Sequence, residues 1–146
     1  MTPQRVTLIT LGVADLERSK AFYAAQGWEV TREMPGSVVF YQLHGCALGL
    51  FGLDPLAAEQ GRDRAELSTG AMTLARNVVS RAEVDAEYAR AIAAGARAIT
   101  PPFETDWGGY SSYHADPDGH VWEIAHNPFW PLEADGSLIL PEGEDD

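Results

Sequence analysis

The stretch WGGYSSYHADPDGHVWEIAHN, residues 107–127, has the pattern of two short strands joined by a tight turn. Asp116 and Pro117 suit the early positions of a turn, and Gly119 can take the positive φ that closes it. Because side chains alternate along a strand, Glu123 shares a face with apolar neighbours, and Trp122 points the opposite way. A buried carboxylate needs a partner, a metal or a proton, whereas the solvent face of an antiparallel sheet would accept it without one. The stretch therefore predicts a hairpin, and Glu123 is its most informative residue.

The sequence before this hairpin repeats one order of elements. In the second half, a strand over 71–79 precedes a helix with a capping box at Ser80 and Glu83, and a strand follows over 97–101. In the first half, Asp15 is a good N-cap for a helix and Gly27 a good stop. The strands expected in that half are 6–13, 28–32, 37–43 and 47–52, with the helix over 16–26.

The repeat predicts an α+β fold of two βαβββ modules that form a curved mixed sheet, a half-barrel cup with the helices outside. The expected single domain divides into module one over 6–53, a linker over 54–70, module two over 71–127 and a tail over 128–146. A ferredoxin-like dimer, with β-α-β-β-α-β order, is the other fold considered. Three successive strand signals after each helix argue against it.

Charge and composition narrow the functional classes. The formal net charge of −12 argues against nucleic acid, which needs a basic surface. No apolar run approaches the roughly 20 residues that cross a bilayer. One cysteine, Cys46, excludes an internal disulfide and suits a reducing, cytoplasmic location. We expect a homodimer, in which the aromatic tail residues Phe129 and Trp130 help to cover open sheet edges.

The segment DPDGHVWEI, within residues 116–124, resembles the closing hairpin of the vicinal oxygen chelate superfamily, which includes glyoxalase I, bleomycin-resistance proteins and extradiol dioxygenases. The resemblance implies that Glu123 points into the cup at one of four metal-site positions. Superposing the two modules by strand order places Leu8, Gly49 and Thr73 at the other three. None of these offers a good metal ligand, so a metal-free cup without a cofactor is the first hypothesis.

On that hypothesis the cup binds a small apolar or aromatic molecule, and the acidic chain favours a cation. The residues expected to line it are Leu8, Thr10, Phe51, Thr73, Asn77, Trp107, His114 and Glu123. His114 lies on the neighbouring strand and could hydrogen-bond Glu123 across the sheet. The alternative is a metal-dependent lyase, isomerase or dioxygenase that uses Glu123 with a histidine such as His114 or His44. Whether the chain is an enzyme is left open.

Overall fold

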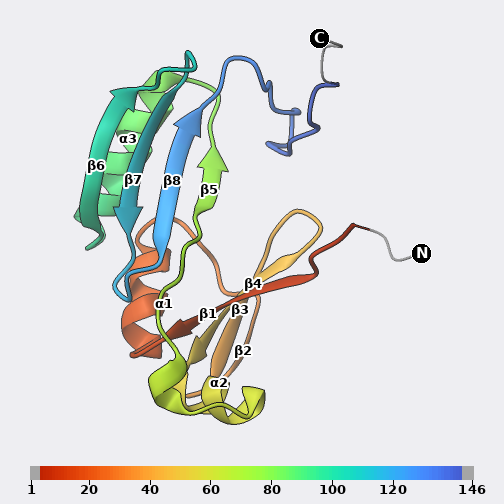
Figure 1. Cartoon of the computed structure of the whole chain (residues 1–146), viewed down its shortest axis with the longest axis vertical. Helices are drawn as coiled ribbons and strands as arrows, with labels where there is room; N and C mark the ends of the chain where they lie inside the picture. The colour runs from red at the N-terminus through yellow and green to blue at the C-terminus, as the bar shows by residue number, and fades with distance from the viewer. Residues whose placement is uncertain (1–3, 143–146) are drawn as a thin grey trace.

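The computed structural model describes residues 4–142, which form two four-stranded mixed sheets of the same topology (Figure 1). In each half a strand leads into a helix, and three further strands follow. The first and last strands of each half pair in parallel, and the other pairs are antiparallel. The α+β fold of two βαβββ modules is therefore confirmed. No helix among residues 4–142 is long and apolar enough to cross a membrane.

Module one forms a sheet of strand order β1-β4-β3-β2. Its helix begins after Asp15, whose side chain accepts a hydrogen bond from the Arg18 N–H, and the chain leaves it through Gly27 at φ 94°. The second strand starts later than predicted, because Trp28 turns into the core instead of joining the ladder. The elements are β1 Leu8–Val13, α1 Leu16–Ala24, β2 Arg32–Met34, β3 Val38–Gln42 and β4 Ala47–Gly52.

The segment predicted as a linker contains a helix, α2 (Leu53–Gln60), and a 3-10 turn over Arg64–Glu66. Proline is tolerated in the first turn of a helix, and Pro55 lies there, so its presence did not exclude α2. The helix packs over Gly12, where an added Cβ would lie 2.7 Å from the Leu53 side chain. Glycine in β1 therefore permits α2 to close one end of the sheet.

Module two forms a sheet of strand order β5-β8-β7-β6. The Ser80 hydroxyl accepts a hydrogen bond from the Glu83 N–H, and the Glu83 carboxylate accepts one from the Val79 N–H. Strand β6 continues through Pro102 to Glu104, past its predicted end at Pro101, because an edge strand can lack ladder donors. The elements are β5 Leu74–Asn77, α3 Arg81–Ala93, β6 Arg97–Glu104, β7 Tyr110–Ala115 and β8 Val121–His126.

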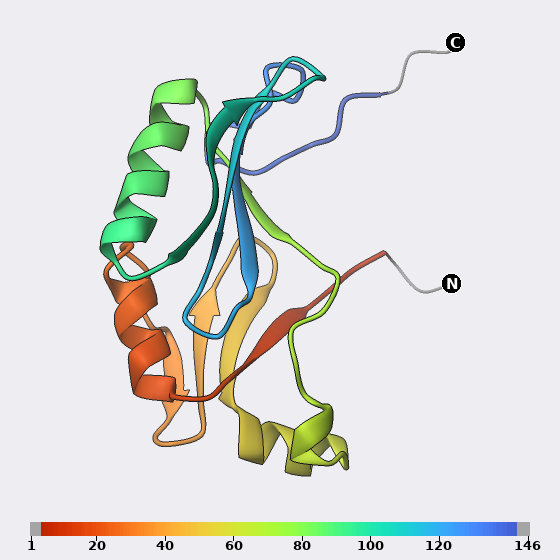
Figure 2. The ribbon, with the colours of Figure 1, turned by 60° about the vertical axis from the view of Figure 1, so that its left-hand side comes forward.

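Helices α1 and α3 lie on the same side of the two sheets (Figure 2), which leaves the opposite faces free of both, with α2 covering one end of the first. We call these the open faces. Within residues 4–142 the two sheets are hydrogen-bonded separately, so the expected curved sheet is realised as two sheets side by side. The chain beyond β8 adds exposed aromatic side chains: Phe129 lies against Gly108 and is 65% exposed, and Trp130 is 42% exposed.

The turn between β7 and β8 joins the two modules. The Asp116 carboxylate accepts hydrogen bonds from the Tyr23 hydroxyl at 2.7 Å and from two backbone N–H groups of its own turn. The Asp118 carboxylate accepts from the Ala14 N–H, Arg18 and Ser19, all at the start of α1. The aspartates that predict the turn therefore also fasten it to module one.

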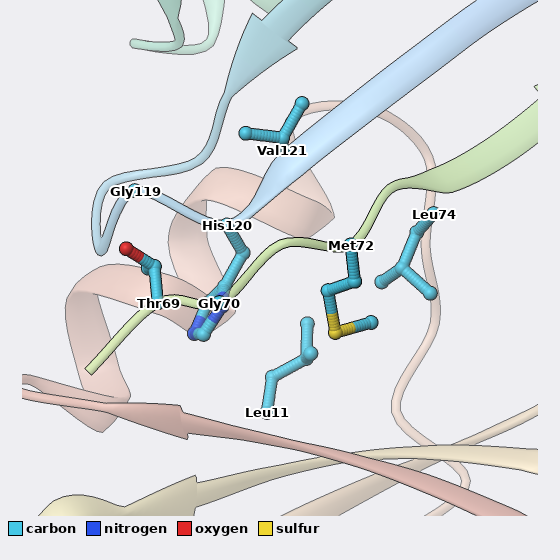
Figure 3. A pocket seen from close by; sticks show the side chains of 8 residues that line it. All are labelled: Leu11, Thr69, Gly70, Met72, Leu74, Gly119, His120 and Val121. Carbon is cyan, nitrogen blue, oxygen red and sulfur yellow. The ribbon is translucent and has the colours of Figure 1, made fainter. Parts of the chain in front are cut away.

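Packing at this junction crosses the boundary between the repeats. Trp122 of β8 lies in the core cluster of module one, and its Nε1–H donates to the Tyr23 hydroxyl at 3.1 Å. His120 is half-buried, and its Nε2 lies 2.7 Å from the Gly12 carbonyl oxygen. Leu11 and Met72 approach each other beside it (Figure 3) around a cavity of ≈ 10 Å³, about the size that holds one water.

Candidate functional site

Glu123 lies on the open face of the second sheet. It pairs with Tyr113 on β7 and with Ala75 on β5, while its neighbours Trp122 and Ile124 are buried on the helix side. Its Oε2 accepts hydrogen bonds from the Ser111 hydroxyl at 2.7 Å and from the Tyr113 hydroxyl at 3.2 Å. The half-buried carboxylate is therefore held by two hydroxyl groups from the adjacent strand.

The carboxylate has capacity for a further donor. Both hydroxyls donate to Oε2, so Oε1 has no hydrogen-bond partner among residues 4–142. No Lys, Arg or His of these residues forms an ion pair with the carboxylate. Burial, and then the Glu123 charge, raise the pKa of Tyr113, so its hydroxyl stays protonated and donates. An arriving cation or N–H donor would meet an oriented carboxylate oxygen.

An aromatic surface adjoins the carboxylate. Phe103 on β6 pairs with Ser111, and its ring stacks on that of Tyr113 with centroids 6.5 Å apart and planes at 24°. Phe103 is 36% exposed, so part of this surface remains available for contact. Asn77 pairs with Ala125 and so shares the Glu123 face. The open face of module two therefore places the Glu123 carboxylate beside two aromatic rings.

The open face of module one is largely apolar around Gly49. Thr10 pairs with Gly49, and a Cβ added to Gly49 would lie 3.2 Å from the ring of Phe40. Leu8 is 42% exposed on the same face, and Phe51 pairs with Val38 toward the end that α2 covers. Of the residues predicted to line the site, Leu8, Thr10 and Phe51 therefore share one open face.

The register corrects the predicted quartet of metal-site positions by two residues in two strands. Thr10 lies beside Gly49, and Ala75 lies beside Glu123. Leu8 pairs with Ala47, and Thr73 precedes β5. Neither correction adds a ligand, because alanine and glycine have none and a neutral hydroxyl is a weak one.

No group of three or more His, Cys, Asp or Glu side chains suited to a metal ion occurs in the described part of the chain. One carboxylate oriented by two hydroxyls is a poor donor set for a transition metal. The residues around Glu123 therefore do not fit the metal centre that the sequence resemblance implies for this position.

His114 does not meet Glu123. It pairs with Trp122, is 2% exposed and lies on the helix side of the sheet, with its ring 6.5 Å from that of Tyr88 on α3. Burial, and then the neighbouring Arg76 charge, lower the pKa of His114 to about 4, so it is neutral at pH 7. The hydrogen bond considered between His114 and Glu123 is absent from the described residues, because strand alternation separates the two side chains.

Trp107 and the remaining histidines have local partners. Trp107 is 46% exposed, and its ring lies against Gly109 in its own loop. His126 contacts the Val78 carbonyl oxygen at 3.1 Å through Nδ1, as a satisfied histidine beside the core. His44 is exposed at the turn before β4.

Sequence reasoning missed Ser111, Tyr113 and Phe103. The first two were within reach, because a hairpin closed at Gly119 places Tyr113 opposite Glu123 by counting outward from the turn. Phe103 was hidden by the two register shifts in β6, which no alternation pattern reveals.

The sequence matches a known protein family. A sequence model described as "Glyoxalase/Bleomycin resistance protein/Dioxygenase superfamily" matches residues 5–124. A search of curated proteins found no match.

Solved structures of similar fold extend the comparison. The crystal structure of a glyoxalase-related enzyme from Fulvimarina pelagi is 39% identical, with a TM-score of 0.89 over 96% of this chain and 100% of that one. A lactoylglutathione lyase from Agrobacterium tumefaciens is 26% identical, with a TM-score of 0.68 over 90% and 100% of the two chains. A glyoxalase/bleomycin resistance protein/dioxygenase from Nocardioides is 25% identical, with a TM-score of 0.72 over 86% and 85%.

Proposed function

Since the chain belongs to the glyoxalase/bleomycin resistance protein/dioxygenase superfamily, we propose that it binds a small organic cation with an aromatic or apolar body on its open face, without a metal ion. The single observation that carries this proposal is the Glu123 carboxylate. It is fixed by Ser111 and Tyr113, and it has no basic partner among residues 4–142.

The surroundings of the carboxylate favour this ligand class. The rings of Phe103 and Tyr113 supply a surface on which a flat or apolar body can lie, and ring faces attract cations. The net charge of −12 adds a long-range attraction for cations. We place this activity in the cytoplasm, where Cys46 would remain a thiol.

A metal-dependent lyase, isomerase or dioxygenase is the second candidate. The similarity to a structure named as a lactoylglutathione lyase favours it. The donor set argues against it, because Thr10, Gly49 and Ala75 supply no ligand to a metal at Glu123. Elemental analysis of protein purified without chelator separates the two, since about one bound metal ion per chain would overturn the metal-free proposal.

A thermal-shift screen tests cation binding. The probes are aromatic amines, amidines and quaternary ammonium compounds. A ligand at 100 times its Kd stabilises the native state by about 2.7 kcal/mol, which raises Tm by roughly 5–10 °C for a chain of this size. Glu123→Gln should abolish the shift for a bound probe, because it removes the charge and keeps the shape.

Glu59→Gln is the matched control, since it removes the same charge from an exposed position on α2. It should leave the shift unchanged. A probe that stabilises the wild type and the Glu123→Gln variant equally would refute the assignment of the site to Glu123.

A homodimer is part of the proposal. The open faces and the adjoining segments expose large apolar side chains that a second copy would cover, among them Leu8, Phe103, Phe129 and Trp130. Light scattering of the full chain should give the mass of two copies, and Phe129→Ser with Trp130→Ser should lower it toward one. A monomeric wild type at micromolar concentration would contradict this part.

A further inference from the structure

A second hollow lies at the edge of the first sheet, where the chain passes from α1 to β2. It is open to solvent, has a volume of ≈ 550 Å³ and is lined by Gly27, Trp28, Glu29, Thr31, Tyr41 and Gln42, among others. This volume is within the range of small-molecule sites. The Tyr41 side chain points to the helix side with Val39, whereas Glu123 belongs to the open face of the other sheet. The hollow is therefore separate from the site around Glu123.

A buried hydroxyl without a partner belongs to one wall of this hollow. Tyr41 is 2% exposed, and its hydroxyl makes no hydrogen bond with any group of residues 4–142. A buried polar group without a partner is unfavourable, so such groups are rare and point to a binding partner. Burial raises the pKa of Tyr41, which keeps the hydroxyl protonated at neutral pH and able to donate as well as accept.

Trp28 lines both this hollow and a smaller one on the side of module two. Its ring lies 5.4 Å from that of Tyr41 and 5.7 Å from that of Trp122. The smaller hollow is also lined by Arg76 and His114, whose Nε and Nδ1 atoms are the other two buried side-chain atoms without a partner in the described chain. All three residues with such atoms therefore share a hollow with Trp28.

The accessible wall consists mainly of acceptors. The Glu29 carboxylate is exposed and forms no ion pair within residues 4–142, whereas the nearby Lys20 is held by Glu33 at 2.8 Å. The Gln42 amide donates to the Leu43 and Cys46 carbonyl oxygens, and its own side-chain oxygen accepts no hydrogen bond within residues 4–142. A ligand that matches these groups carries N–H donors and a positive charge.

We propose that this hollow is a second ligand site for a planar organic cation, whose ring lies on Trp28 and whose N–H groups donate to Glu29 and Tyr41. Because the Tyr41 hydroxyl is sealed from solvent, binding displaces the Trp28 ring. This site shares no residue with the site around Glu123, so a failure of the function proposed above would not affect it.

Benzamidine is the probe, because its amidinium is planar, charged and attached to one ring. Titration into the ¹⁵N-labelled full chain, followed by ¹H–¹⁵N correlation spectra, should shift the amides of residues 27–31 and 42 and the indole N–H of Trp28. Glu29→Gln and Tyr41→Phe should each raise the Kd for these shifts about tenfold or more, since each removes a charge-assisted or buried hydrogen bond. Glu123→Gln should leave them unchanged, and uncharged benzamide should bind more weakly.

Three results would overturn the proposal. One is shifts confined to β8 and its neighbours, and another is the absence of saturating shifts up to about 10 mM benzamidine. The third is an unchanged Kd in both Glu29→Gln and Tyr41→Phe, which would leave the Tyr41 hydroxyl with water alone. Glu29 is exposed, so its substitution tests the site even if a core variant is unstable.

Discussion

Two buried tyrosines of module one allow a sharp test of the junction between the modules. Tyr23 and Tyr41 are 1% and 2% exposed, and both lie in the same core cluster. Only Tyr23 has hydrogen-bond partners within residues 4–142: its hydroxyl donates to Asp116 at 2.7 Å and accepts from the Trp122 indole at 3.1 Å. Tyr→Phe removes one oxygen from each site and leaves the ring in place.

The expected effects differ because of what each hydroxyl leaves behind. In Tyr23→Phe, the Asp116 carboxylate loses one donor, and the buried Trp122 N–H loses its acceptor. A hydrogen bond to a charged group contributes about 1.5–3 kcal/mol, and an orphaned buried group costs about 1–3 kcal/mol. We expect a loss of about 3 kcal/mol in the free energy of unfolding and a fall in Tm of roughly 6–12 °C. Tyr41→Phe should change stability by less than about 0.5 kcal/mol, or increase it, because no partner is orphaned.

Urea denaturation without ligand, followed by far-UV circular dichroism, measures both variants against the wild type. Equal m-values would show that the comparison concerns stability and not the compactness of the unfolded chain. The reasoning is refuted if the two variants lose the same free energy, or if Tyr41→Phe loses more. Either result would mean that ring packing, and not the Tyr23 hydroxyl, holds the modules together.

Three further predictions concern single positions. Gly109→Ala should cost about 1–3 kcal/mol and change Trp107 emission, since a Cβ there would lie 2.1 Å from the Trp107 ring; Gly70→Ala, with nothing within 4 Å, should be neutral by the same denaturation assay. Because the folded pKa of His114 is about 4, below its ordinary 6.5, its contribution to stability is complete above pH 6.5 and is lost as pH falls toward 4. That loss is roughly 3 kcal/mol in the free energy of unfolding. His114→Asn should flatten the dependence of this free energy on pH, measured by urea denaturation between pH 4 and 6.5; an unchanged dependence would contradict the prediction. Ser111→Ala should weaken probe binding at the open face severalfold, by calorimetry, because the Glu123 carboxylate loses its shorter hydrogen bond.

Local chemistry made much of this fold predictable. The Asp15 and Ser80 caps and the turn at Gly119 are specified by side chains next to the structures that they form. The predicted bounds of strands were wrong where tertiary contacts determine them. The residues directly after Trp28 do not join the sheet, because the Trp28 ring packs into a core made by both modules. Strand β6 accepts prolines because it lies at the edge of its sheet.

In the candidate site, too, local patterns predict some features, and tertiary contacts determine the others. Alternation along β8 predicts which face Glu123 occupies, and that face is the one observed. The same rule, applied with the observed register, separates His114 from Glu123, although adjacency of their strands had suggested a contact. The anchoring by Ser111 and Tyr113 needs the pairing of two strands, and the stacking of Phe103 needs the irregular pairing of a third. Information of that kind is not contained in a single segment.

The position of Trp122 has a consequence for how such a repeat can change over time. The repeat ends the first copy before residue 71, yet the indole of the second copy completes the interior of the first. A fragment cut at that point would keep its strands but lose one wall of its interior and the carboxylates that hold the start of α1. The first copy therefore depends on the second for part of its interior, and a recombined chain that kept the first copy alone would lack it.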